Sequence, residues 1–182
     1  FRFAWLMRSQ RKFPEAVEFS KKALLKAPQD RQIRAEYFLN LGRVMFASGY
    51  DISAIVWLDK AEELLDPAIT NATAVDTYRF LTLAWSSRLN YQVALKYAEK
   101  WISVSGRTQF RYKHRQALFE LATIQSASGQ TKRANLTLEK GVKLAVDENS
   151  AYHACIFLTS LLLHALDEGE IPKARNYLRE LE

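Results

Sequence analysis

Apolar residues recur three and four positions apart along most of the chain, and short polar or glycine-containing breaks interrupt them. This spacing places the apolar side chains on one face of an α-helix. The pattern therefore predicts an all-α protein of ten helices. Their predicted ranges are 1–9, 14–27, 30–48, 52–65, 72–88, 91–104, 109–128, 131–146, 149–167 and 171–181.

The same pattern occurs five times. Aligned without gaps, the five segments carry an alanine at one position, at steps of 38, 40, 40 and 40 residues, and a large apolar residue 13 positions earlier. The alanines are Ala16, Ala54, Ala94, Ala134 and Ala174, and the large residues are Phe3, Leu41, Leu81, Leu121 and Leu161. A short side chain lets two helices approach closely, and the large side chain fills the space beside it. The repeat thus predicts five stacked helical hairpins with one extended core.

Glycine and proline support these boundaries. Gly49, Gly129 and Gly169 stand at three of the predicted hairpin turns, where a β-carbon would clash. Pro14 and Pro172 fall in the first turn of a second helix, where a missing N–H costs nothing.

The arrangement resembles the tetratricopeptide repeat family over essentially the whole chain. The second repeat carries the likeness best, with Leu41-Gly42 in its first helix, Gly49 at the turn, and Ala54 and Ala61 in its second helix. The family repeat has about 34 residues, so the hairpins here are longer by more than one helical turn. They are most similar to long-helix variants such as kinesin light chains and bacterial peptide-sensing regulators. The resemblance implies a right-handed superhelical solenoid whose concave side is lined by the first helix of each hairpin.

We expect a single repeat domain over residues 1–182. Its predicted repeats span approximately 1–28, 29–67, 68–106, 107–147 and 148–182. Because the chain begins at Phe1 rather than at a methionine, we interpret it as a piece of a longer protein.

The resemblance also suggests where a ligand would bind, because groove-lining positions in the family follow a fixed spacing on each first helix. Carried onto this sequence, that spacing assigns to the groove Trp5, Arg8, Leu39, Arg43, Phe46, Arg79, Leu83, Phe119 and Thr123. Arginine forks onto carboxylates, and aromatic rings give rigid apolar contact. The set favours an acidic or amphipathic peptide. The alternative is that the apolar members are packing residues and that the arginines are solvated.

The carboxylate clamp of chaperone-binding family members does not recur. The corresponding positions hold Phe1, Trp5, Asn40, Asp76 and Phe80, and only the asparagine matches. Binding to a chaperone tail is therefore not expected.

Charge changes this picture only slightly. The chain has 26 Lys and Arg against 20 Asp and Glu, and the net charge of +6 is lower than nucleic-acid-binding domains usually carry. A basic cluster precedes the fourth leucine register, and its members are Arg107, Arg111, Lys113, His114 and Arg115. We expect this cluster to be solvated surface, with a patch for an acidic partner or nucleic acid as the alternative.

Nothing in the sequence indicates catalysis, a cofactor or a metal. It lacks a phosphate-binding loop, a dinucleotide fingerprint, a zinc-protease motif and a nucleophile elbow. His153 and the single cysteine, Cys155, are two positions apart and so face different sides of a helix. The longest apolar stretch is too short to span a membrane. A cytoplasmic location is expected, and a periplasmic one stays open.

These observations predict a non-enzymatic, protein- or peptide-binding scaffold. One alternative is a ligand- or peptide-sensing domain of a signal-transduction or transcription regulator, and another is an oligomerisation segment. Solenoid ends without polar caps expose apolar surface. Tyr177, Leu178 and Leu181 are therefore expected to meet further repeats or to support self-association.

Overall fold

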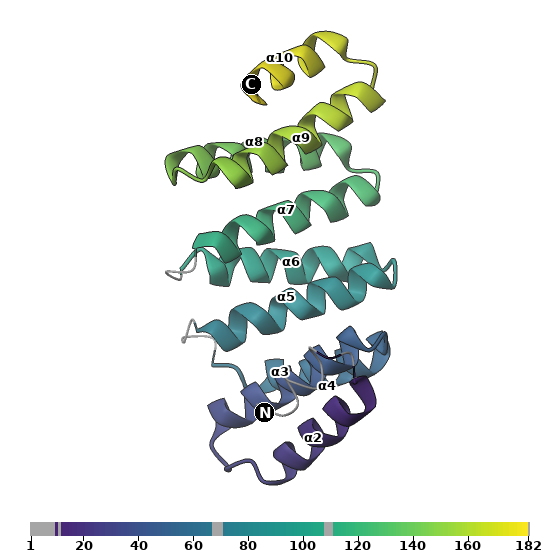
Figure 1. The fold of residues 1–182 in the computed structure, drawn as a ribbon, viewed down its shortest axis with the longest axis vertical. Helices are drawn as coiled ribbons and strands as arrows, with labels where there is room; N and C mark the ends of the chain where they lie inside the picture. The colour runs from purple at the N-terminus through teal and green to yellow at the C-terminus, as the bar shows by residue number, and fades with distance from the viewer. Residues whose placement is uncertain (1–9, 11, 67–70, 108–110, 182) are drawn as a thin grey trace. The chain divides into compact units, whose positions relative to one another are not determined.

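The computed structural model describes residues 10, 12–66, 71–107 and 111–181, and within them every regular element is an α-helix (Figure 1). The helices, labelled as in Figure 1, are α2 (Phe13–Leu25), α3 (Arg31–Ala47), α4 (Asp51–Leu64), α5 (Ala72–Ser87), α6 (Tyr91–Ser105), α7 (Arg111–Ala127), α8 (Thr131–Asp147), α9 (Ala151–Asp167) and α10 (Ile171–Leu181). The all-α prediction is confirmed, and these boundaries lie within two residues of the predicted ones. The predicted helix 1–9 lies outside the described residues.

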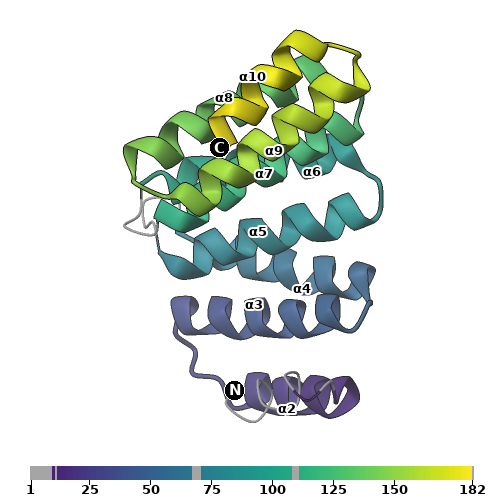
Figure 2. The ribbon, with the colours of Figure 1, turned by 45° about the horizontal axis from the view of Figure 1, so that its top comes forward.

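The chain divides into two compact units, residues 1–108 and 109–182. In unit 1, α3 packs against α2, α4 and α5, and α5 packs against both α4 and α6 (Figures 1 and 2). In unit 2, α7 packs on α8, α8 on α9, and α9 on α10. Within the described residues, unit 1 thus contains α2 and the stacked hairpins α3–α4 and α5–α6, and unit 2 contains the stacked hairpins α7–α8 and α9–α10. The single domain and the right-handed superhelix stay predictions.

The predicted alanine register is buried between the helices. All five alanines of the register are buried, with at most 3% of their surface exposed. The leucines 13 positions earlier, Leu41, Leu81, Leu121 and Leu161, are buried as well, whereas Phe3 lies outside the described residues. The seam between the paired helices thus follows the repeat that the sequence predicts.

Five turns share one backbone geometry, in which a residue with positive φ follows a helix. Gly49, Gly129 and Gly169 have φ of 79°, 77° and 72°, which confirms their predicted role. Leu89 and Asn149 take the same position with φ of 59° and 52°. In each turn the next residue donates its N–H to the carbonyl five residues earlier, which satisfies an end carbonyl of the helix. Leu89 therefore adopts the positive φ that glycine adopts at the equivalent turns, although it carries a β-carbon.

We expect Leu89→Gly to stabilise unit 1. The left-handed conformation costs a leucine about 1–2 kcal/mol, and the 70% exposed side chain has little packing to lose. The greater backbone freedom of glycine in the unfolded chain offsets part of that gain, so the net effect should be about 0.5–1 kcal/mol. Urea denaturation at unchanged m-value measures it. Leu89→Ala, which keeps the β-carbon, should show no such gain, and a loss of stability in Leu89→Gly would contradict the expectation.

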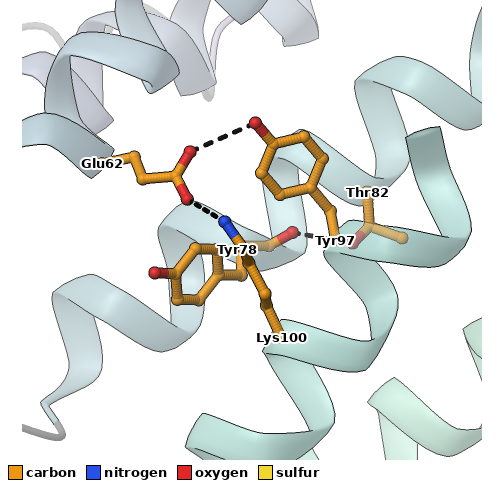
Figure 3. A network of polar contacts seen from close by, with 5 residues as sticks. All are labelled: Glu62, Tyr78, Thr82, Tyr97 and Lys100. Atoms are coloured by element: carbon orange, nitrogen blue, oxygen red, sulfur yellow. Dashed lines mark hydrogen bonds and ion pairs between the residues drawn. The ribbon is translucent and has the colours of Figure 1, made fainter. Parts of the chain in front are cut away.

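A polar network joins hairpin α3–α4 to hairpin α5–α6 (Figure 3). The Glu62 carboxylate on α4 accepts a hydrogen bond from the Tyr97 hydroxyl at 3.1 Å and pairs with the Lys100 ammonium at 2.6 Å. That ammonium lies 5.1 Å and 5.5 Å from the ring centroids of Tyr97 and Tyr78. Burial and the Glu62 charge raise the pKa of Tyr97. The network therefore links α4 to α5 and α6 through side chains of both hairpins.

Candidate functional site

Three residues predicted to line a groove meet around one phenyl ring between α3 and α5. The Cζ atoms of Arg43 and Arg79 lie 5.3 Å and 5.2 Å from the centroid of the Phe80 ring. Phe46 packs on the same ring edge to face, with centroids 6.0 Å apart and planes at 69°. We call Arg43, Phe46, Arg79 and Phe80 the arginine–phenylalanine cluster.

The helical repeat explains why these side chains converge. Arg43 and Phe46 are three residues apart on α3 and so share a face, and that face packs against α5. The aromatic face attracts a guanidinium, and a stacked guanidinium keeps its N–H edge for hydrogen bonding. All four side chains of the cluster are half-buried. Asp76 lies one helical turn before Phe80 and is also half-buried. The side chains near the cluster therefore include an acidic group as well as the two arginines.

The other predicted groove residues of unit 1 are not part of the cluster. Leu39 is only 4% exposed and belongs to the core with Leu41 and Leu58, whereas Leu83 is half-buried on α5. Trp5 and Arg8 lie outside the described residues.

The two predicted groove residues of unit 2 do not form a comparable cluster. Phe119 packs edge to face on the buried Phe157, with ring centroids 6.0 Å apart, and so contributes to the core. Thr123 is exposed, and its hydroxyl donates a hydrogen bond to the Phe119 carbonyl at 3.0 Å. The convergence of arginine and aromatic side chains is therefore found in unit 1.

Phe80 was not assigned to the groove from the sequence, although it organises the cluster. It precedes Leu81 of the buried register, and an aromatic residue beside a core position is read first as packing. A signal was present, because Phe80 occupies a clamp position of the family and directly follows a predicted groove arginine.

A second polar cluster joins three helices of unit 2. The Ser126 hydroxyl lies 3.1 Å from His164 Nε2, and His164 Nδ1 lies 2.6 Å from Asn135 Oδ1. This order matches a nucleophile, a base and an orienting group. Ser126, however, lies in the last turn of α7, where unpaired backbone groups are carbonyls rather than N–H donors. Those carbonyls would repel an oxyanion. We therefore interpret the cluster as a structural hydrogen-bond network that links α7, α8 and α9.

The basic cluster at the start of α7 corrects the expectation of a solvated surface. Lys113 and Arg115 are buried, and the Arg115 guanidinium forms an ion pair with Glu148, whose side chain is 9% exposed. Arg111, which is exposed as expected, lies 3.6 Å from the same carboxylate. Burial and the Arg111 charge lower the pKa of Arg115, and burial together with the Arg115 charge lowers the pKa of His153. The run therefore divides between surface and interior, and Glu148 of the α8–α9 turn supplies the acidic partner of Arg115.

The described residues contain no group of three or more His, Cys, Asp and Glu side chains that could hold a metal ion. Among their helices, none combines the length and the apolar character needed to cross a membrane.

No protein-family model matches the sequence. Nor does any curated protein match it in sequence. Solved structures do match the fold. A Podosopora anserina putative kinesin light chain with nearly identical TPR-like repeats superposes with a TM-score of 0.83 at 18% identity, over 99% of this chain and 90% of that one.

Two larger proteins contain the same arrangement. A Pyrococcus horikoshii signal-transduction ATPase with a tetratricopeptide repeat sensor matches with a TM-score of 0.85 at 18% identity, over 99% of this chain and 28% of that one. A Rap protein complexed with competence and sporulation factor matches with a TM-score of 0.71 at 15% identity, over 98% of this chain and 50% of that one. The repeat prediction is thereby confirmed at the level of the fold, and the chain is a helical-repeat protein with the tetratricopeptide-type fold.

Proposed function

We propose that the chain is a protein- or peptide-binding scaffold and that the arginine–phenylalanine cluster is its principal contact site. The observation that carries the proposal is the sharing of Phe80 by two guanidinium groups from neighbouring hairpins. Holding two half-buried cations near one another costs free energy through desolvation and like-charge repulsion, and stacking on the ring keeps both guanidinium groups oriented. An oriented pair of guanidinium groups is suited to an anionic partner.

The chemistry of the cluster favours an acidic or amphipathic peptide segment. A carboxylate can accept two parallel hydrogen bonds from one guanidinium, which gives both strength and direction. Phe46 and Leu83 offer apolar surface beside the two arginines. A segment with an acidic residue next to a large apolar one would use both kinds of contact. Thr123 and Phe119, in unit 2, stay predictions from the sequence and are not part of the cluster.

Proteins of similar fold support a binding role in general terms. The Rap protein was solved in complex with competence and sporulation factor, and the repeats of the Pyrococcus horikoshii protein are described as a sensor. In both proteins the repeat array is part of a longer chain.

A peptide panel tests the proposal. Peptides of about 15 residues would share apolar anchors and differ only in charge, and fluorescence polarisation would measure their binding to the whole chain. We expect the acidic peptides to bind more tightly than the neutral and basic ones, and added salt to weaken them. Arg43→Glu with Arg79→Glu should lower the affinity for acidic peptides at least tenfold, which corresponds to about 1.4 kcal/mol.

The matched control changes the same net charge elsewhere in unit 1. Lys21 on α2 and Lys96 on α6 are both exposed, so Lys21→Glu with Lys96→Glu alters long-range electrostatics without touching the cluster. If both double variants weaken binding equally, net charge and not the cluster determines affinity. Equal binding of acidic and basic peptides would contradict the proposal outright.

A further inference from the structure

A cavity of about 570 Å³ lies between α2 and the hairpin α3–α4 in unit 1. Small-molecule sites in proteins have volumes of roughly 300–1,000 Å³, and most of their lining is apolar. Apolar side chains form most of this lining too, and three hydroxyl groups complete it. The described lining residues are Phe13, Pro14, Val17, Met45, Ser48, Tyr50 and Ser53. None of these side chains is charged, which distinguishes the cavity from the arginine–phenylalanine cluster.

The three hydroxyl groups indicate which polar contacts a ligand could make. The Ser48 hydroxyl donates its hydrogen bond to the Val44 carbonyl at 2.7 Å, so it is left as an acceptor for any further partner. Tyr50 and Ser53 are exposed, and their hydroxyls can either donate or accept. An ionic ligand would lose hydration without meeting an opposite charge among the lining residues. The lining therefore suits an uncharged molecule that carries a hydrogen-bond donor.

The repeat indicates the kind of group that the cavity could hold. One repeat step after Met45 stands Trp85 on α5, so the next hairpin carries an indole at the position of a flexible thioether chain. Trp85 is half-buried, and its indole nitrogen is buried. Met45 is itself 8% exposed and lies in the wall of the cavity. The chain thus supplies a ring system at one repeat and leaves a cavity beside the equivalent residue of the repeat before it.

Tyr50 is a second departure from the repeat at this cavity. The equivalent positions in the other four repeats are all polar and hold Lys12, Asn90, Gln130 and Glu170. Tyr50 instead places an aromatic ring beside the cavity, and the residue is 61% exposed. Aromatic rings stack on one another, and a methionine sulfur atom also contacts them favourably. Tyr50 and Met45 therefore both favour an aromatic ligand.

We propose that this cavity binds a small, flat, uncharged aromatic molecule with a hydrogen-bond donor. The rings of the ligand lie against Phe13, Val17 and Met45. Tyr50 covers them, and Ser48 accepts the hydrogen bond. Because the walls belong to α2, α3 and α4, the bound ligand joins α2 to the hairpin that follows it. The cavity shares no residue with the arginine–phenylalanine cluster, so the site is independent of the proposed peptide contact.

Methionine methyl resonances test the site, because the chain has only two methionines, Met7 and Met45. The probe is 2-naphthol, and naphthalene-2-sulfonate is the comparison compound with the same rings and a negative charge. In the whole chain with isotope-labelled methionine methyl groups, assigned with the help of Met7→Leu, we expect 2-naphthol to shift the Met45 signal saturably through its ring current. The sulfonate should bind at least about tenfold more weakly, because no cation lines the cavity to replace its hydration.

Matched tryptophan substitutions locate the binding. Ser53→Trp places a large side chain on the wall of the cavity and should lower the affinity for 2-naphthol at least about tenfold. Ser103→Trp is the control with the same change, because Ser103 is exposed on α6 and does not line the cavity, and it should bind normally. The absence of a saturable Met45 shift, or full binding by Ser53→Trp, overturns the proposal. It is also overturned if Arg43→Glu with Arg79→Glu removes 2-naphthol binding, because the probe then occupies the arginine–phenylalanine cluster.

Discussion

Glu148→Gln is expected to destabilise unit 2 by about 3 kcal/mol, although it changes only one charge and almost no volume. The Glu148 side chain is 9% exposed and forms an ion pair with Arg115, whose side chain is 10% exposed. Removing the carboxylate charge leaves a buried guanidinium beside a second one, that of Arg111. Desolvation of an unpaired cation is far more costly than loss of a solvated pair. Urea denaturation followed by circular dichroism would measure the effect.

Two comparison variants identify burial as the cause. Arg111→Gln removes an arginine that is 72% exposed and lies 3.6 Å from the same carboxylate, so it should cost no more than about 0.5 kcal/mol. Replacing both Arg115 and Glu148 with methionine removes both charges and should cost less than Glu148→Gln alone. If the double replacement is the more destabilising of the two, the pair itself supplies the stability and the explanation through an unpaired charge is wrong.

Gly141→Ala is expected to destabilise unit 2 by about 2 kcal/mol, against the usual gain from alanine inside a helix. A β-carbon at position 141 would lie 2.4–2.6 Å from three atoms of the Phe157 ring. That ring is 1% exposed and is held by the edge-to-face contact with Phe119. It cannot move aside without disturbing the core of unit 2, so the contact strains either the ring or the spacing of α8 and α9.

A double-mutant cycle tests this explanation. Phe157→Leu alone should destabilise unit 2, because it removes buried apolar volume. Combined with Gly141→Ala, it should cost at least about 1 kcal/mol less than the sum of the two single changes, since the smaller side chain leaves room for the β-carbon. If the losses in free energy of unfolding are additive, the two positions do not interact as the structure indicates.

The backbone plan of this protein could be predicted from the sequence because it depends on local and periodic features. Helix ranges follow from apolar spacing, and the alanine and leucine registers follow from the repeat. Leu89 is a position that these local features do not predict. A leucine gives no local signal for positive φ, and only its alignment with Gly49 and Gly129 indicates the turn.

The candidate site could be predicted only in part, because it depends on which side chains reach across neighbouring helices. Arg43, Phe46 and Arg79 were found through family spacing, but their meeting at Phe80 depends on how α3 packs on α5. The prediction that Arg115 is solvated was wrong for the same reason. Its acidic partner, Glu148, is 33 residues away in sequence, and no periodic pattern links the two positions.

The residues seven positions after the register alanines have a further consequence. Three of these positions hold Ala61, Trp101 and Gly141, which differ greatly in volume, and all three are buried. Gly141 faces Phe157 so closely that a methyl group does not fit. The hairpins are therefore not interchangeable although their register alanines recur at equal steps, and a chain with their order shuffled would contain both cavities and steric clashes.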